Sequence, residues 1–368
     1  MALSITGVGM VTSLGFGVSG SCGGVRAGLS MPRRLKAKAS DGEGQVSQVV
    51  GFTVPQIANG LVQAGAWVQL AKSAVEDLRH SAELPGDDDL GFWQRAKILG
   101  ALPHLDPDRF GWGLQDLPEG PQNSFLHPLL GLAFPRDTNA GQWMALGHAS
   151  TAALFMGARN ELATRGTDRC LIVAADSYVD PLTLDWLARA ARLKSGESPS
   201  GLMPGEAGGA LLLETDEAVR RRKAAVLGTL EAMALDSVAP PPPDPEDEDA
   251  PSPMPPAAPL GRAIAEAISK VLPGVLFTGD LYLDLNGEDW RAAAWGHAQV
   301  HLSKRIDWSS CRTFAPAESL GETGAASGAL AVGLALFNFD ADDTQDALVV
   351  SVAENGTVSA LRLRAPRP

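Results

Sequence analysis

Hydrophobic and polar positions follow different periods along the chain, and the pattern is clearest in the segment 141–214. Between 152 and 162, apolar residues recur at three- and four-residue spacing, which predicts a buried helix. A continuous apolar run follows at 170–175, as expected for a strand covered on both faces, and a second run occupies 210–213. The segment therefore predicts the order strand, turn, buried helix, strand, loop and strand.

The same alternation of strand-like and helix-like segments continues on both sides of this segment. Residues 3–15 form an apolar stretch that breaks into a glycine-punctuated turn, and a helix of small residues is expected at 323–337. Both halves thus run strand, buried small-residue helix, strand, which predicts an α/β protein built by duplication. The other predicted elements are a helix at 54–78, a strand at 97–102, a loop-rich region at 103–128, a helix at 261–272, a strand at 281–285, a helix at 289–298, a strand at 311–314, a strand at 347–352 and a hairpin-like strand at 357–363.

Proline and acidic residues are concentrated in the segment 239–258, which contains the run PPPPDPEDEDAPSPMPP. Repeated prolines prevent a helix or strand, and the acidic run at 244–249 cannot be buried. The segment is predicted to be a surface insertion, either a disordered solvated loop or an interaction tail. It divides the chain into an N-terminal half at 1–235, an insertion at 236–259 and a C-terminal half at 260–368.

Composition and charge narrow the classes of partner. The 368 residues are 45% hydrophobic, enough for a sizeable core, and the formal net charge is −13. Nucleic acid and anionic membranes are not expected as partners, because binding them needs clustered lysine and arginine. The basic cluster at 220–223 is predicted to be a solvated turn. No apolar run reaches about 18 residues and the N-terminus lacks a charged signal region, so a cytoplasmic protein is expected.

Three cysteines, Cys22, Cys170 and Cys311, are widely spaced and form no C-x-x-C pair. The spacing indicates neither a disulfide framework nor a structural zinc site. Cys170 falls in a predicted buried strand, Cys311 leads another, and Cys22 follows the first strand on a glycine-rich turn. Each is predicted to be a small core residue rather than a nucleophile. No metal and no cofactor is expected.

Two motifs carry a resemblance to a known family. The segment P-G-E-A-G-G-A-L-L-L-E at 204–214 is similar to the P-G-E-G-A-A-A-L-V-L-E signature of β-ketoacyl synthases, which are thiolase-fold condensing enzymes. The opening I-T-G-V-G-M-V-T-S-L-G at 5–15 resembles the opening of the same family. A dinucleotide-binding turn is a weak alternative there, because the third glycine of that motif falls at Thr12. The resemblance implies a thiolase-like fold, duplicated βαβαβ halves in α/β/α/β/α layers, and a dimer.

The resemblance also implies where the catalytic residues should lie, and these positions are changed. The family's nucleophilic cysteine lies in A-C-[AS]-S, where this sequence has G-H-A-S and therefore His148. The two family histidines that polarise the malonyl thioester are replaced by Asn286 and Glu322, and the family lysine by Ala317. The C-terminal G-F-G-G-T turn reads A-E-N-G-T at 353–357. The condensing triad is therefore replaced while the small framework residues remain, which indicates a pseudoenzyme.

More than one role is possible for His148, Asn286 and Glu322. Helix position and burial both favour a neutral imidazole, so His148 could act as a base oriented by Glu322. A cluster of these residue types also resembles a metal set or a hydrolytic dyad. The preferred interpretation is that three buried polar residues satisfy one another and have no catalytic role.

Three functions follow from this pattern. The first is a non-enzymatic accessory or adaptor subunit, as for degenerate thiolase-like proteins associated with bacterial type VI effector secretion. The second is a chain-length-factor-like partner of an active ketosynthase in fatty acid or polyketide synthesis. The third is an acyl-thioester enzyme with altered chemistry at His148. The expected partner is a second copy or a related thiolase-fold subunit, with an effector or an acyl carrier as a further candidate.

Overall fold

The computed structural model describes residues 3–40, 46–110, 122–136, 138–195, 199–242, 253–342 and 344–366. The first half of the chain contains β1 (Leu3–Thr12), β2 (Gly15–Phe16), α1 (Val18–Arg26), β3 (Arg33–Ser40), β4 (Val46–Gly51), α2 (Ala64–Ser81), α3 (Leu90–Trp93), β5 (Ala96–Ala101), α4 (Pro107–Phe110), the π-helical turn η1 (Gln122–Leu126), α6 (His127–Ala133), β6 (Asn139–Met144), the 3-10 turn η2 (Gly147–Ala149), α7 (Ser150–Leu162), β7 (Arg169–Ser177), α8 (Pro181–Arg189), β8 (Glu206–Glu214) and α9 (Asp216–Arg222). The second half contains β9 (Gly228–Ser237), α10 (Ala257–Val271), β10 (Asp280–Leu283), α11 (Asp289–Leu302), β11 (Thr313–Phe314), α12 (Ala317–Leu320), the 3-10 turn η3 (Gly324–Ala326), α13 (Ser327–Ala341), β12 (Asp346–Val352) and β13 (Thr357–Arg364).

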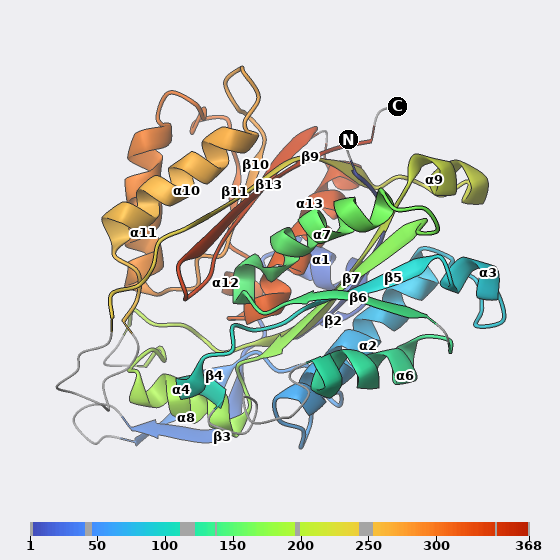
Figure 1. The fold of residues 1–368 in the computed structure, drawn as a ribbon. Helices are drawn as coiled ribbons and strands as arrows, with labels where there is room; N and C mark the ends of the chain where they lie inside the picture. The colour runs from blue at the N-terminus through green and yellow to red at the C-terminus, as the bar shows by residue number, and fades with distance from the viewer. Residues whose placement is uncertain are drawn as a thin grey trace.

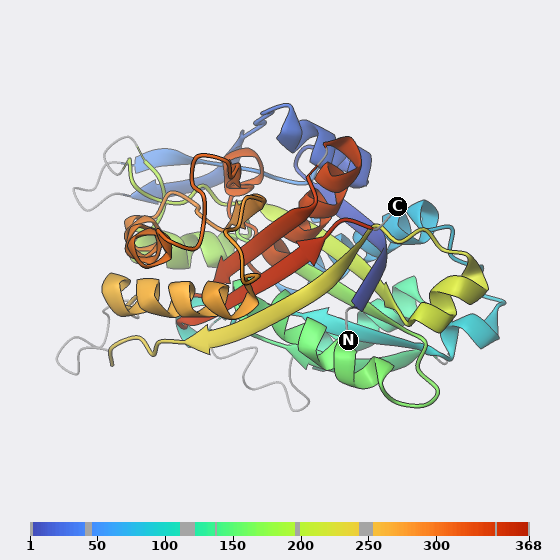
Figure 2. The same ribbon diagram turned by 90° about the horizontal axis from the view of Figure 1, so that it is seen from above.

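The strands confirm the expected duplication. The first repeat has the order β6-β5-β7-β8-β1, and the second has the matching order β11-β10-β12-β13-β9. In each repeat the first three strands in that order are parallel and the last two are antiparallel to their neighbours. The two repeats join because β1 pairs with both β8 and β9. Figure 2 shows β9 and β13 running side by side. Residue 235, where the first half was expected to end, lies inside β9.

The elements stack in five layers, which confirms the expected α/β/α/β/α architecture. Helix α2 packs on one face of the first repeat's sheet, and α10 and α11 cover the second repeat's sheet. Helices α7 and α13 lie between the two halves of the sheet (Figure 1). Both are rich in small residues, which lets them approach the strands on either side closely.

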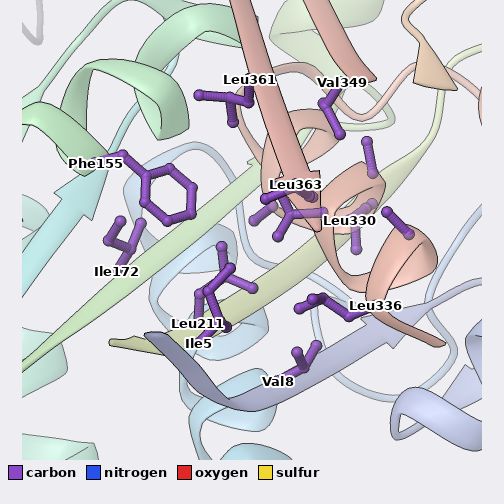
Figure 3. Close-up of a cluster of buried hydrophobic side chains, with 14 of the residues drawn as sticks. Ile5, Val8, Phe155, Ile172, Leu211, Leu330, Leu336, Val349, Leu361 and Leu363 are labelled. Carbon is purple, nitrogen blue, oxygen red and sulfur yellow. The ribbon is translucent and has the colours of Figure 1, made fainter. Parts of the chain in front are cut away.

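The central layer forms a core shared by both repeats. Figure 3 shows Phe155 of α7 beside Ile172 of β7, and Leu330 of α13 near Leu363 of β13. All of these side chains are buried. Among the described residues, one helix, 324–341, is long and apolar enough to cross a membrane by length and composition alone, which the search for continuous apolar runs did not identify. It comprises η3 and α13, and 78% of it is buried in this core.

Glycines of the two recognised motifs allow backbone to pack on backbone. A Cβ atom on Gly9 would lie 2.0 Å from the carbonyl oxygen of Ala74, and one on Gly208 would lie 2.2 Å from that of Leu70. Both carbonyls belong to α2, which therefore lies directly on β1 and β8. These glycines are required by the packing of the fold, whatever the chemistry of the site.

Several expected boundaries differ from the structure. The helix expected at 54–78 begins ten residues late, at Ala64, because Phe52 and Val54 bind backbone and side-chain atoms near β8 instead. The region 103–128 contains α4, η1 and the start of α6; residues 111–121 lie outside the described part. The helix expected at 289–298 continues to Leu302, and Cys311 precedes β11 without forming part of it.

The basic cluster at 220–223 ends a helix, and the described ends of the insertion lack regular structure. Residues 220–223 were expected to be a solvated turn, but they form the end of α9 and its left-handed cap. Arg222 donates to the buried carboxylate of Glu214 at 2.7 Å, and Arg221 pairs with Asp168, so tertiary ion pairs hold the cluster in place. In the insertion, 239–242 and 253–256 have no regular structure. The acidic run at 244–249 lies outside the described residues.

Candidate functional site

Two matching turns bring the sequence-predicted residues together. The 3-10 turns η2 and η3 precede the central helices α7 and α13, and each begins with a glycine in the left-handed region, Gly147 at φ 54° and Gly324 at φ 49°. The two turns contact each other. His148, inside η2, therefore faces Glu322, which lies two residues before η3.

The three replaced positions form one hydrogen-bonded group. His148 Nε2 lies 2.8 Å from Glu322 Oε1, which also accepts a bond from the backbone N–H of Gly324 at 2.7 Å. The other carboxylate oxygen of Glu322 accepts from Asn286 Nδ2 at 2.5 Å. His148 and Glu322 are only 2% and 3% exposed. Both oxygens of Glu322 are therefore occupied by donors of the protein itself.

The pKa of His148 is shifted in the direction opposite to the one expected. Burial lowers the pKa of His148, but the Glu322 carboxylate outweighs this effect, and the net pKa is raised above its ordinary value. Burial likewise raises the pKa of Glu322, yet His148 and Arg291 lower it to well below its usual range. Each partner thus favours the charged form of the other. The sequence argument considered burial and the helix terminus but lacked the partner charge.

Arg291 and Asp284 flank this pair and were not identified from the sequence. Arg291 Nη1 donates to Asp284 Oδ2 at 2.9 Å and to the carbonyl oxygen of Val352 at 2.5 Å. Its Nη2 lies 3.5 and 3.4 Å from the two ring nitrogens of His148, so the guanidinium faces the ring. The sequence offered one signal for this pair. An aspartate directly follows the apolar run of β10, and an arginine lies in the first turn of the next helix, α11.

A second group of charges continues the network outward. Arg192 donates to both carboxylate oxygens of Glu288, at 2.6 and 3.0 Å, and to Glu354 at 2.6 Å. Glu288 in turn accepts from Asn286 at 2.9 Å. Glu354 belongs to the segment 353–357 that replaces the family's glycine-rich turn. The network therefore extends without interruption from Arg192 to His148.

Little space is left beside His148. The cavity that His148 lines together with Glu322 and Asp284 has a volume of about 20 Å³. That volume holds about one water molecule. An acyl chain on a thioester does not fit there in this arrangement of side chains.

A buried arginine supports η3 from the other side. Arg109 of α4 donates to Asp176 at 2.7 Å, and Asp176 accepts the backbone N–H of Ala325 at 3.0 Å. The ring of Tyr178 lies 4.1 Å from the Arg109 guanidinium. Because Asp176 belongs to β7 and Ala325 to η3, this cluster ties the two repeats together at the candidate site. The sequence argument missed it, since its members are far apart along the chain.

The cysteines do not replace the missing thiol. Cys170 is buried in β7, as expected, whereas Cys22 lies inside α1 rather than on a turn. Burial raises the pKa of both thiols to about 12, and that of the half-buried Cys311 to about 11. A thiol with so high a pKa is a poor nucleophile near neutral pH.

The site does not have the features of a metal centre. No cluster of three or more metal-ligating side chains occurs within the described ranges. Glu322 is surrounded by the N–H donors of His148, Asn286 and Gly324, and the Arg291 guanidinium lies against the same imidazole. A metal cation at this point would meet two positive groups and no free carboxylate oxygen.

Known proteins resemble this chain in structure and not in sequence. No protein-family model and no curated protein matches the sequence. The ketosynthase from module 6 of the bacillaene synthase of Bacillus subtilis 168 aligns with a TM-score of 0.72 at 13% identity, over 100% of this chain and 72% of that one. A β-ketoacyl synthase from Burkholderia phymatum STM815 aligns with a TM-score of 0.69 at 15% identity, over 99% of both chains. The ishigamide ketosynthase/chain length factor aligns with a TM-score of 0.67 at 20% identity, over 100% of both chains.

These identities are too low to transfer an activity, but the alignments cover the whole chain. They therefore show a shared fold and no more. The resemblance expected from the 5–15 and 204–214 motifs is thus confirmed as a shared fold. The chain has the thiolase-like fold of the β-ketoacyl synthases.

Proposed function

We propose that this chain is a non-enzymatic accessory subunit, a pseudoenzyme that keeps the ketosynthase fold for binding another protein. The proposal is carried by His148, which stands at the expected position of the family nucleophile and is hydrogen-bonded to Glu322 in a buried pair. Condensation by the family mechanism needs a thiolate at that position. The nearest described thiols lie in the fold's core or at its edge and have raised pKa values.

Altered chemistry at His148 has less support. A general base must be unprotonated and within reach of a substrate proton. Glu322 instead raises the pKa of the His148 imidazole and occupies its Nε2 atom, Arg291 lies against the ring, and the adjoining cavity has room for about one water. These features favour the interpretation in which His148, Asn286 and Glu322 satisfy one another.

The open edge of the sheet supports a second thiolase-fold subunit as the partner. Strand β6 ends the order of the first repeat and pairs only with β5 within the described part of the chain. A strand at the edge of a sheet can present its backbone to a strand of another subunit. Helix α7 packs beside β6 and leaves Met156 46% exposed. A chain-length-factor-like role is further supported by the similarity to the ishigamide ketosynthase/chain length factor.

The experiment is affinity purification of the tagged protein from its native host, followed by mass spectrometry of bound proteins. The proposal predicts recovery of a thiolase-fold subunit, either a second copy or a cysteine-containing synthase. An adaptor in bacterial effector secretion is the second candidate, and it predicts effectors or delivery components instead. A Met156→Glu variant, which places a charge on the exposed side of α7 beside β6, serves as the matched control and should lose a partner bound at this edge. Purification of the wild type without any protein partner would contradict both.

A further inference from the structure

A second cavity lies near the His148 site, and charged side chains stand between the two. It has a volume of about 350 Å³, and its lining comes mainly from the end of α8, residues 200–201, residues 253–254 and the first turn of α11. The cavity beside His148 has a volume of about 20 Å³, and the two share no lining residue among those described. They are therefore separate spaces in this structure.

The two cavities are linked by a short series of hydrogen bonds. Glu288 lines the larger cavity and accepts from Asn286 at 2.9 Å. Asn286 donates in turn to Glu322, which lines the smaller cavity together with His148. Two side chains, those of Glu288 and Asn286, thus lie between the larger cavity and the buried pair.

Arg192 completes this boundary by holding two carboxylates. It lines the larger cavity, donates to both oxygens of Glu288 and donates to Glu354 at 2.6 Å. The side chains of Arg192, Glu288 and Glu354 are only 7%, 5% and 11% exposed. Burial raises the pKa of Glu354, but the charges of Arg192 and His148 outweigh this effect and lower it below its ordinary value. The Glu354 carboxylate is therefore close to both the guanidinium and the imidazole.

The backbone immediately before Arg192 has an unfavourable conformation. Ala191 has a φ of 50°, in the left-handed region that favours glycine at the end of a helix. The N–H of Arg192 donates to the carbonyl oxygen of Leu187 at 2.9 Å and closes the end of α8. Such residues persist where the surrounding contacts fix them, and they cluster at functional and switching segments. The turn that places Arg192 against its two carboxylates is therefore formed at a cost.

The closed arrangement also leaves one donor of Arg192 unsatisfied. Its buried Nη1 atom has no hydrogen-bond acceptor among the described residues. An unpaired buried donor is costly, and a buried ion pair contributes little stability beyond what apolar side chains of the same size would give. Packing alone therefore does not account for a charged boundary at this place in the fold.

We infer that Arg192 is a latch that closes the His148 site by holding Glu288 and Glu354 together. Release of Arg192 joins the larger cavity to the space beside His148 and lets small molecules reach the buried pair. The inference goes beyond the proposed function, which needs no opening of the site, and its test needs no protein partner.

The test measures whether a small reagent reaches position 148. The full-length His148→Cys variant is treated with iodoacetamide, and labelling of each cysteine-containing peptide is followed by mass spectrometry. We expect slow labelling at position 148 while Arg192 is present, and a rate at least about tenfold higher when Arg192→Ala is added. The buried Cys22 and Cys170 should stay unlabelled and so report that the rest of the fold is intact.

A second variant separates an opening from a change in charge. Glu354→Ala removes a carboxylate and keeps the pair of Arg192 and Glu288, and it should also speed labelling. The two variants change the local charge in opposite directions, so an effect on the thiol pKa alone would change the two rates in opposite directions. Arg189→Ala is the matched control, because Arg189 pairs with Asp185 on the surface of α8 and should leave the rate unchanged.

Rates at position 148 that do not change, or that change in opposite directions in Arg192→Ala and Glu354→Ala, overturn the inference. Labelling of Cys170 in step with position 148 in both variants also overturns it, because the ion pairs then support the whole fold rather than one boundary. If Cys170 is labelled in only one variant, the rate in the other decides.

Discussion

The Nε2 atom of His148 lies 2.8 Å from the Oε1 atom of Glu322, and these two residues come from matching turns of the two repeats. The motifs around them predict that each stands where the resembled family has a catalytic residue. On that alignment the two changes form a complementary pair. The pair neutralises itself in the buried interface between the central helices, which is the condition for keeping charged groups there.

The first prediction concerns the ion pair itself. Glu322→Gln removes the carboxylate charge that raises the pKa of His148 and leaves a neutral amide oxygen as the acceptor beside the imidazole. We expect the free energy of unfolding to fall by about 3–5 kcal/mol, as for other broken buried pairs. Denaturant unfolding measures this change. The control is Glu318→Gln on the neighbouring helix α12, where the side chain is exposed. A loss no larger than that of the control would argue against a buried ion pair.

The second prediction follows from the two pKa shifts. The pKa of His148 is raised in the folded state, so its contribution to stability is complete below its ordinary value of 6.5 and is lost as the pH rises through the folded value. The pKa of Glu322 is lowered, so its contribution is present above its ordinary 4.5 and is lost as the pH falls. The destabilisation caused by His148→Leu should therefore be larger at pH 6 than at pH 9. Equal destabilisation at both pH values would mean that His148 is neutral in the folded protein.

The third prediction tests why the motif glycines are retained. Gly208→Ala places a methyl group against the carbonyl of Leu70 in α2, so we expect a loss of about 2–3 kcal/mol in unfolding free energy. Gly131→Ala, in α6, meets no atom within 4 Å and should gain about 0.5–1 kcal/mol through its helix propensity. Thermal denaturation of both variants gives the comparison. Similar behaviour of the two would show that α2 does not lie directly on β8.

The fourth prediction is that restoring the thiol does not restore the chemistry. His148→Cys places a thiol beside the Glu322 carboxylate, which raises the thiol pKa, and Asn286 still stands where the first family histidine should be. We expect no acyl adduct after incubation with an acyl thioester, as measured by intact-protein mass spectrometry. Stoichiometric acylation of this variant, absent from the wild type, would show that the site still has room for an acyl group.

Several strands and the two central helices could be predicted from the sequence, because their hydrophobic patterns depend only on neighbouring residues. The apolar run at 170–175 and the motif at 204–214 lie within β7 and β8, and both central helices were identified from their small residues. The start of α2 could not be predicted, because the N–H of Val54 binds the Glu206 carboxylate, 152 residues away. Contacts of that kind depend on the finished fold.

Some residues of the candidate site could be predicted from the sequence and others could not. His148, Asn286 and Glu322 were located because each stands within a motif whose surroundings are preserved. Arg291, which faces His148, is 143 residues away in the sequence and carries no motif. The raised pKa of His148 could not be derived for the same reason, since it depends on a carboxylate 174 residues away. The geometry of the charges could therefore not be derived from their positions in the chain.

The most direct test of the account is a turnover measurement on the purified protein. Wild type and His148→Ala are incubated with acyl and malonyl thioesters, and condensation, decarboxylation and hydrolysis products are quantified by mass spectrometry. The account predicts that both proteins give the same product levels as buffer alone. Turnover by the wild type that disappears in His148→Ala would contradict it and would make this chain an enzyme.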